Sequence, residues 1–430
     1  MAGFLGMRGT GDWATDQRPK NWRETILYLY PNGSAPLTAI LSKMKSSSVD
    51  DPEFNWWTKT LPAQGGAVTN VYTDVTLSTA YVNGGVAGQT LYVNVAEAVA
   101  NEFRVGHQVL LRDSSHYDVD VNALVTDVVK NGASSYIACR LLEADDNGAS
   151  TDLSDCDRIL IIGNVNPEGG ALPDAISYNP EKWYNYTQIW RTPLEITRTA
   201  RKTKLRTGDA YQEMKREALE LHSIEMEKSF FWGIRTENTG ANGKPERTTD
   251  GILNAIRRGA AANIDDFSLN VDYTGDTWLT SGEVWLDTMM EQIWRYGKKD
   301  KVGFAGSGAV LGINRLVKNG ATFEFVPTTA EYGIQVLKWT TAFGSLSLIL
   351  HPLFSYEVTN RNSIVICEPE NMQYRYIDDT NFYKANEKTV DSGQERIDGT
   401  KEEFLTEAGL EYHHPIGWGY LNGVGVDNDL

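Results

Sequence analysis

A glycine-rich segment, Gly303–Gly312, follows a predicted strand and precedes a predicted helix, as a nucleotide-binding loop would. A dinucleotide fingerprint would need its third glycine at position 311, which is Leu311, and no Gly-Lys-Ser/Thr follows as a phosphate-binding loop requires. We therefore interpret the segment as a tight turn between a strand and a helix.

A second segment approaches the first half of a calcium-binding loop through Asp118, Asp120 and Asn122. Its sixth position is Ala123 instead of glycine, and its twelfth is Val129 instead of a bidentate glutamate. Solvated acidic side chains are the default interpretation, and a weak, adventitious cation site is the alternative.

The histidines and cysteines of the chain form no recognisable catalytic or metal-binding motif. The six histidines form no HExxH motif, and the three cysteines, Cys139, Cys156 and Cys367, lack the close pairs of a zinc site or disulfide framework. We expect no catalytic residue, no metal site, no cofactor and no enzyme activity. A dispersed carboxylate pair could still serve a hydrolytic enzyme, and the twelve tryptophans could form a glycan-binding surface, so these alternatives stay open.

Two groups of side chains favour protein–protein contacts. One consists of aromatic residues in the extended segments 54–61 and 176–190, and the other is a basic run ahead of a long helix. Ion pairs with acidic surfaces of neighbouring copies, such as Glu402-Glu403 and Asp378-Asp379, explain the basic run better than phosphate contacts, which remain an alternative. The candidate intersubunit residues are Trp56, Trp57, Trp183, Tyr184, Tyr186, Arg198, Arg201, Lys202, Lys204 and Arg206.

Charge divides the chain of 430 residues into unlike parts. The formal net charge is −17, whereas most proteins that read nucleic-acid sequence carry a net positive charge. Residues 86–180 contain fourteen acidic and five basic side chains (net −9), whereas residues 181–261 contain eleven and fifteen (net +4), so we interpret them as separate structural units. No apolar run approaches the roughly 18 residues of a membrane span, and no signal peptide is visible at the start.

The first half of the chain is predicted to be an arm followed by an interrupted hairpin. We interpret residues 1–50, with a short helix over 22–30, as an arm that becomes ordered on contact with another surface. A flexible terminus is the alternative. The hairpin comprises 51–85 and 171–190 and carries an inserted β-module at 86–170. The module is expected to be a small antiparallel barrel or sandwich, with Asn131-Gly132 as a hairpin turn and strands over 91–95, 105–111, 121–129, 136–142 and 158–162.

The second half predicts an α+β fold around one long helix, 208–232, whose apolar residues recur at helical spacing. Glu213, Glu217, Glu220 and Glu227 are expected on its surface. A capping box at Thr280 and Glu283 predicts another helix ending near 296. The other expected elements are a strand over 301–305, a helix over 309–318, and strands over 334–339, 346–350, 363–367, 372–377 and 404–412.

This order of parts resembles the major capsid proteins of tailed double-stranded DNA bacteriophages, which have the Hong Kong 97-type fold. The segments that carry the resemblance are 184–200, 218–222, 230–233, 249–252 and 363–370. The resemblance implies an N-terminal arm (1–50), an extended loop (51–85 and 171–190), a peninsular part with the spine helix (191–260), and an axial part with closing peninsular strands (261–430).

The resemblance also implies a function. Such a protein assembles with itself, as hexamers and pentamers, into an icosahedral shell around the double-stranded DNA genome. Its contacts with the packaged DNA are non-specific. Its expected partners are scaffolding, portal and possibly decoration proteins, with no membrane. Assembly is expected in the host cytoplasm, with a separate scaffold and no large N-terminal cleavage, and the protein ends in the virion. An encapsulin-like compartment shell is the alternative of the same fold.

Overall fold

The computed structural model divides the chain into two compact units, which we describe separately. Unit 1 comprises Met1–Thr58 and Lys182–Leu430, and unit 2 comprises Lys59–Glu181. The helix predicted over 22–30 and most of the predicted arm lie outside the described residues. No helix in the described part is long and apolar enough to cross a membrane. The structure describes residues 45–60, 62–146, 152–170, 172–203, 210–318, 325–329, 335–341, 343–384 and 399–430.

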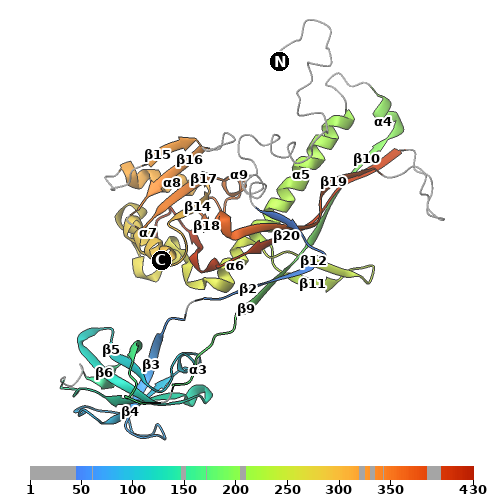
Figure 1. Ribbon diagram of the computed structural model, residues 1–430. Coiled ribbons are helices and arrows are strands. Elements are labelled where there is room, and N and C mark those ends of the chain that lie inside the picture. The colour runs from blue at the N-terminus through green and yellow to red at the C-terminus, as the bar shows by residue number, and fades with distance from the viewer. Residues whose placement is uncertain are drawn as a thin grey trace. The chain divides into compact units, whose positions relative to one another are not determined.

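Unit 2, drawn in blue to green in Figure 1, is a closed antiparallel barrel. Its strand order is β3-β4-β7-β6-β5-β8. Burial alternates along the strands, as in β5, so that one set of side chains fills the interior. The predicted small barrel is therefore confirmed. Its strands are β3 (Gly65–Tyr72), β4 (Thr90–Val95), β5 (His107–Asp113), β6 (His116–Val129), β7 (Tyr136–Leu141) and β8 (Arg158–Asn164), and the short helix α3 (Glu97–Ala100) follows β4.

The barrel begins earlier than the predicted limit at residue 86. Strand β3 pairs with β4 on one side and with β8 on the other, so the barrel cannot close without it. A register shift between Val68 and Asn70 places Val68 and Val71, three residues apart, in the same core. That shift breaks the alternation by which a strand is recognised in a sequence.

Unit 1 contains a seven-stranded mixed sheet with the order β13-β21-β18-β14-β17-β16-β15. Strand β18 is buried on both faces: Ile364 and Ile366 contact the core on the side of α7 and α8, and Val365 and Cys367 contact the core on the side of α5 and α6. The elements are β13 (Ile264–Asp266), β14 (Asp300–Ala305), β15 (Phe325–Thr329), β16 (Gln335–Thr340), β17 (Ser345–Leu350), β18 (Ile364–Cys367), β21 (Gly419–Asn422), α6 (Ile252–Gly259), α7 (Trp278–Trp294), α8 (Ser307–Lys318) and α9 (Pro352–Tyr356).

A second sheet of unit 1 supports the long helix. Its order is β1-β19-β20-β10, and α5 lies along β10 and β20 (Figure 1). Leu194 and Ile196 of β10 pack with Leu219 of α5 in one apolar cluster. The elements are β1 (Ser46–Ser48), β10 (Gln188–Thr197), β19 (Met372–Lys384), β20 (Gly399–Tyr412) and α5 (Ala210–Trp232). The mixed helices and sheets of unit 1 and the small barrel of unit 2 match the predicted α+β class.

The long helix α5 ends where predicted, at Trp232, because Gly233 passes very close to other backbone atoms. A Cβ at Gly233 would lie 2.4 Å from the Ser229 carbonyl oxygen and 2.5 Å from the Thr249 carbonyl oxygen. One predicted surface residue of this helix is misplaced. Glu227 is fully buried and contacts Nε2 of His351 at 2.8 Å, since that turn faces the core and not solvent.

The predicted capping box of α7 is wrong. The helix begins at Trp278, two residues before Thr280, and Thr277 occupies the N-cap position. The Trp278 backbone N–H donates to Oδ1 of Asp427 at 2.8 Å. The cap therefore comes from the end of the chain, a long-range contact that local sequence cannot reveal.

Two hairpins complete unit 1. Strands β2 (Glu53–Thr58) and β9 (Glu181–Tyr186) pair with each other, which joins the two predicted aromatic arms of the interrupted hairpin. Strands β11 (Thr236–Thr239) and β12 (Pro245–Thr248) form an antiparallel hairpin after α5. The short helix α4 (Arg198–Lys202) connects β10 to the segment before α5.

Candidate assembly site

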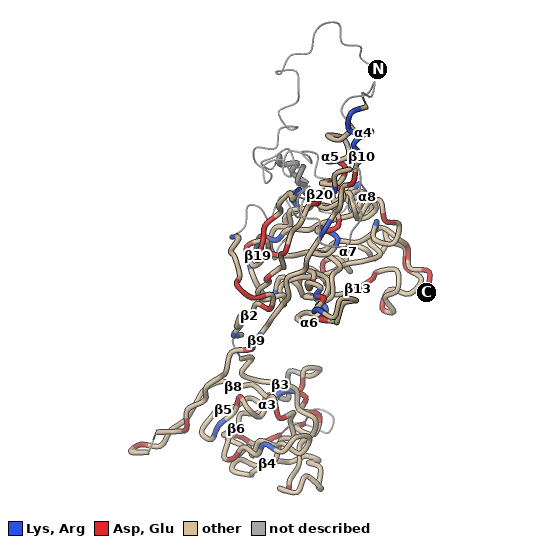
Figure 2. Tube along the Cα trace, turned by 90° about the vertical axis from the view of Figure 1, so that its right-hand side faces the viewer, with Lys and Arg blue, Asp and Glu red and all other residues tan. Residues whose placement is uncertain are grey.

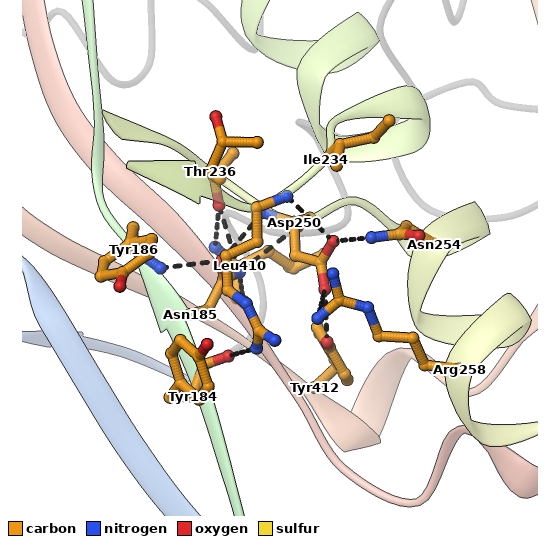
Figure 3. A network of polar contacts seen from close by, with 12 residues as sticks. Tyr184, Asn185, Tyr186, Ile234, Thr236, Asp250, Asn254, Arg258, Leu410 and Tyr412 are labelled. Atoms are coloured by element: carbon orange, nitrogen blue, oxygen red, sulfur yellow. Dashed lines mark hydrogen bonds and ion pairs between the residues drawn. The ribbon is translucent and has the colours of Figure 1, made fainter. Parts of the chain in front are cut away.

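The carboxamide of Asn185 on β9 connects the base of the β2–β9 hairpin to other parts of unit 1. Asn185 is fully buried, and its Nδ2 donates to the Leu410 carbonyl oxygen at 2.7 Å, to the Thr249 hydroxyl at 3.2 Å and to the Asp250 carbonyl oxygen at 3.3 Å (Figure 3). Its Oδ1 accepts the Asp250 backbone N–H at 2.8 Å. The hairpin base is thus tied to β20 and to the turn before α6.

The carboxylate of Asp250 is the second centre of this network (Figure 3). It is fully buried, accepts the Tyr412 hydroxyl at 2.7 Å and the Arg235 backbone N–H at 3.3 Å, accepts from Nδ2 of Asn254, and lies 3.5 Å from Nη1 of Arg258. Burial, and next the neighbouring Asp250 charge, raise the pKa of the Tyr412 hydroxyl. Through these partners the buried carboxylate of Asp250 joins β20 to α6.

The aromatic residues predicted as intersubunit anchors divide into covered and exposed ones. Trp56 is only 6% exposed, and its ring lies 5.2 Å from that of Tyr412, so its surface is already used within the chain. Trp183 is half-buried and lies 6.1 Å from the same ring. Trp57 lies on the opposite face of β2 from Trp56 and is 62% exposed. Only Trp57 of the three presents most of its surface to another molecule.

Tyr184 and Tyr186 form a half-exposed ladder with two arginines. Their rings lie 5.8 Å apart, the Arg235 guanidinium lies 3.6 Å above Tyr184, and that of Arg247 lies 6.0 Å from Tyr186. Burial is the main cause that raises the pKa of Tyr186, followed by the charge of Glu53. Such stacked tyrosine and arginine side chains are typical of binding surfaces.

The described part of the basic run lies on α4, where Figure 2 shows it in blue. Arg198, Arg201 and Lys202 are all exposed, and the Arg201 guanidinium lies 4.9 Å from the Tyr211 ring. Lys204 and Arg206 lie outside the described residues. The α4 surface therefore presents exposed cationic side chains, among them Arg201 and Lys202.

The acidic partners predicted for this run are engaged inside their own chain. Glu402 is 5% exposed and accepts the Tyr211 hydroxyl, and Glu403 pairs with Arg191 at 2.6 Å across the β10–β20 ladder. Asp378 accepts from Asn381 at 2.7 Å and from Tyr383 at 2.7 Å. These internal contacts occupy part of the acidic surface, and the predicted ion pairs with a neighbouring copy stay a prediction.

The glycine segment 303–312 is a turn that other parts of the chain fill. A Cβ at Gly306 would lie 2.3 Å from the Arg361 carbonyl oxygen, and one at Gly312 would lie 2.5 Å from Cα of Gly425. Strand β14 and helix α8 flank the segment as predicted. Glycine is needed at these positions because a side chain would collide with neighbouring backbone atoms. The interpretation of the segment as a tight turn between a strand and a helix is confirmed.

The partial calcium-loop motif is also accounted for by an internal contact. Arg112 donates from Nε and Nη2 to the two oxygens of Asp120, both at 2.7 Å. That hydrogen bonding lowers the pKa of Asp120 and leaves its carboxylate paired. Within the described ranges, no group of three or more histidine, cysteine or acidic side chains is placed to hold a metal ion.

The sequence model of one family, described as SU10 major capsid protein, matches residues 8–425. The chain belongs to the SU10 major capsid protein family. It is 26% identical over 440 residues to the major capsid protein of Pseudomonas phage PaMx41, and the alignment covers 99% of this chain and 97% of that protein. This SU10-family chain is thus the major capsid protein of a phage and part of the virion, as the resemblance implied.

Solved structures similar to this capsid protein have low sequence identity. A structure of Microbacterium phage Oxtober96 is 11% identical, with 89% of this chain and 90% of that chain covered and a TM-score of 0.40. The holo-SrpI encapsulin complex from Synechococcus elongatus PCC 7942 is 13% identical, with 59% and 78% covered and a TM-score of 0.38.

The network at the hairpin base was missed by residue-type reasoning. Asn185 and Asp250 enter the sequence-based prediction only as members of the segments 184–200 and 249–252, which resemble capsid proteins, and Tyr412 enters only as the end of a strand. One feature of the sequence could have indicated the network. Asn185 stands between two tyrosines in an aromatic strand, and a polar residue that is buried in such a strand needs hydrogen-bond partners.

Proposed function

We propose that this capsid protein has the Hong Kong 97-type fold and assembles as hexamers and pentamers into the icosahedral shell around a double-stranded DNA genome. The family match over 8–425 carries the proposal. The order of parts supports it: an arm, a hairpin with an inserted barrel, a long helix, and a mixed sheet with closing strands. In this assignment 1–50 is the arm, 191–260 the peninsular part with the spine helix, and 261–430 the axial part with the closing peninsular strands.

The surface of unit 1 suggests how copies contact one another. Trp57 and the ladder of Tyr184 and Tyr186 offer aromatic contact area, and α4 offers Arg201 and Lys202 as cations. Shell symmetry repeats each weak contact many times, so exposed ion pairs worth about 0.2–1 kcal/mol each sum to a stable assembly.

In this proposal the protein is structural and has no enzyme activity. Its partners are a scaffolding protein, a portal and possibly decoration proteins, and its contacts with packaged DNA are non-specific. Assembly takes place in the host cytoplasm. The acidic net charge of −17 supports weak contact with DNA, because a strongly basic wall would bind the genome tightly.

Electron microscopy of the purified protein tests the proposal. We expect capsomers of five and six copies, and closed shells when a scaffold or high protein concentration is supplied. A species that stays monomeric at every concentration and salt would contradict it. Shells that enclose a protein cargo without nucleic acid when isolated from the host would instead support a compartment shell.

A further inference from the structure

Three loops at one end of the unit 2 barrel carry acidic side chains and no basic ones. They connect β3 to β4, β5 to β6 and β7 to β8, and the chain enters and leaves the barrel at the opposite end. We call them the distal loops. Their sequences, 73–89, 114–115 and 142–157, contain seven aspartate or glutamate residues and no lysine or arginine.

The distal loops are joined to one another by hydrogen bonds. The Asp145 backbone N–H donates to the Gly85 carbonyl oxygen at 2.8 Å, which joins the β7–β8 loop to the β3–β4 loop. The Ser114 backbone N–H donates to Oδ1 of Asp157 at 2.8 Å, which joins the β5–β6 turn to the β7–β8 loop. The three loops therefore form one continuous surface.

This surface exposes large apolar side chains. Val82 is 70% exposed, Val86 is 62% exposed and Leu142 is 44% exposed. Val86 directly follows Gly85 and Leu142 precedes Asp145 by three residues, so both lie close to the hydrogen bond that joins the two loops. Apolar side chains that gather on a surface in this way are typical of a site that another molecule covers.

The carboxylates of the distal loops differ in how far their own chain engages them. Asp157 accepts from Ser114, and Asp74 accepts the Ser78 hydroxyl at 2.8 Å. Asp146 and Asp155 are exposed, and among the described residues neither side chain has a hydrogen bond or an ion pair. A cationic partner can therefore reach these two carboxylates.

The exposed surface of α4 is complementary to the distal loops. Arg201 and Lys202 are exposed there, and Glu402, one of the acidic partners predicted for them, accepts the Tyr211 hydroxyl within its own chain. Arginine and lysine can cover apolar surface with the aliphatic part of the side chain while the charged end reaches a carboxylate. The two cations thus suit both the exposed valines and the exposed carboxylates.

We propose that the distal loops of one copy bind α4 of a neighbouring copy and so join subunits in the shell. The inference rests on the proposed function, because it names the acidic partner of the α4 cations. A contact between two unlike surfaces is heterologous, so each copy can provide one surface to one neighbour and the other surface to a second neighbour. Contacts of this kind close into rings and shells.

Charge reversal on both surfaces of the full-length protein tests the proposal. The barrel variant is Asp146→Lys with Asp155→Lys, and the α4 variant is Arg201→Glu with Lys202→Glu. We expect each variant to raise the protein concentration of half-maximal assembly, measured by light scattering, by about ten-fold or more. A chain with all four substitutions should assemble near the wild-type concentration, because the charges are complementary again. If that chain assembles no better than the barrel variant, the proposal is overturned.

The matched control is Glu168→Lys with Asp174→Lys, which changes the net charge equally at exposed positions of the segment after β8. It should assemble like the wild type. Calorimetry of the unassembled subunit establishes that the barrel variant folds. Asp146→Asn with Asp155→Asn is a milder second variant, and it should weaken assembly in the same direction.

An equimolar mixture of the barrel variant and the α4 variant distinguishes contact between copies from contact within one copy. We expect the two to associate at concentrations at which neither associates alone, measured by sedimentation velocity. No association in the mixture would assign the distal loops to a contact within the chain or to a different cationic partner, and would overturn the proposal. A wild type that never assembles would contradict the proposed function as well, whereas a barrel variant that assembles like the wild type would overturn this inference alone.

Discussion

At the hairpin base, Asn185 makes hydrogen bonds that no smaller or apolar side chain can replace. Its two amide atoms serve two strands and a turn inside a site without solvent. Removal of the side chain would leave the Leu410 carbonyl and the Asp250 amide without these partners. The cost of such orphaned buried groups exceeds the modest net value of each hydrogen bond.

We expect Asn185→Ala to lower the free energy of unfolding of unit 1 by about 2–4 kcal/mol. Urea unfolding followed by tryptophan fluorescence measures this, since every tryptophan lies in unit 1. Asn238→Ala, at an exposed position of β11, should change it by less than about 0.5 kcal/mol. Equal effects from both variants would contradict the assigned role.

His222 of α5 joins the long helix to the sheet beneath it as a neutral side chain. Nδ1 lies 2.9 Å from the Thr192 hydroxyl and Nε2 lies 2.7 Å from the Thr406 hydroxyl. Burial lowers the pKa of His222 to about 4. The folded-state pKa is thus below the unfolded value of about 6.5, so the stabilising contribution is complete above pH 6.5 and is lost as the pH falls through 4.

Between pH 6.5 and 4 this histidine should reduce the stability of unit 1 by up to about 3 kcal/mol. His222→Gln can still bond to hydroxyl groups and cannot be protonated, so we expect a flatter pH dependence in this window. Urea unfolding at several pH values measures it. His414→Asn, at an exposed position, serves as the control and should keep the wild-type slope.

At the scale of elements, α4 is a short helix with an exposed cationic surface at the end of a long strand. Reversal of two of its charges should disturb contact with another copy and leave the fold of the subunit intact. We expect Arg201→Glu with Lys202→Glu to block or strongly weaken assembly, with the urea midpoint of the free subunit unchanged. Light scattering and sedimentation measure the assembly.

The control for this variant is Lys130→Glu with Arg257→Glu, which changes the net charge equally at two other exposed positions. It should assemble like the wild type. Normal shells from the α4 variant that lose only their DNA would indicate that the run faces the genome.

The barrel of unit 2 should be dispensable for folding of unit 1. Strands β2 and β9 pair with each other, so a hairpin loop of a few residues can connect Thr58 to Lys182. We expect a chain with Lys59–Glu181 replaced by Gly-Asn-Gly-Ser to unfold with the wild-type tryptophan transition. An insoluble product, or one without a cooperative transition, would show that unit 1 needs the barrel.

At the scale of the whole molecule, the proposed contacts make assembly sensitive to salt. Screening lengths fall from about 8 Å at 0.15 M to about 3 Å at 1 M, so exposed ion pairs weaken. We expect less assembly as NaCl rises, measured by light scattering at constant protein concentration. Assembly that strengthens with salt would indicate apolar contacts, such as those of Trp57, as the main source of affinity.

The sequence by itself determined the elements whose side chains repeat regularly. Five barrel strands are short apolar or alternating runs between turn residues, and α5 follows helical spacing up to Gly233, so local pattern alone located them. Tertiary structure decided what depends on distant contact: β3 closes the barrel despite a register shift, Asp427 caps α7, and Trp56 and Glu402 are covered by their own chain. These outcomes depend on which surfaces meet after folding, and local periodicity carries no information about that.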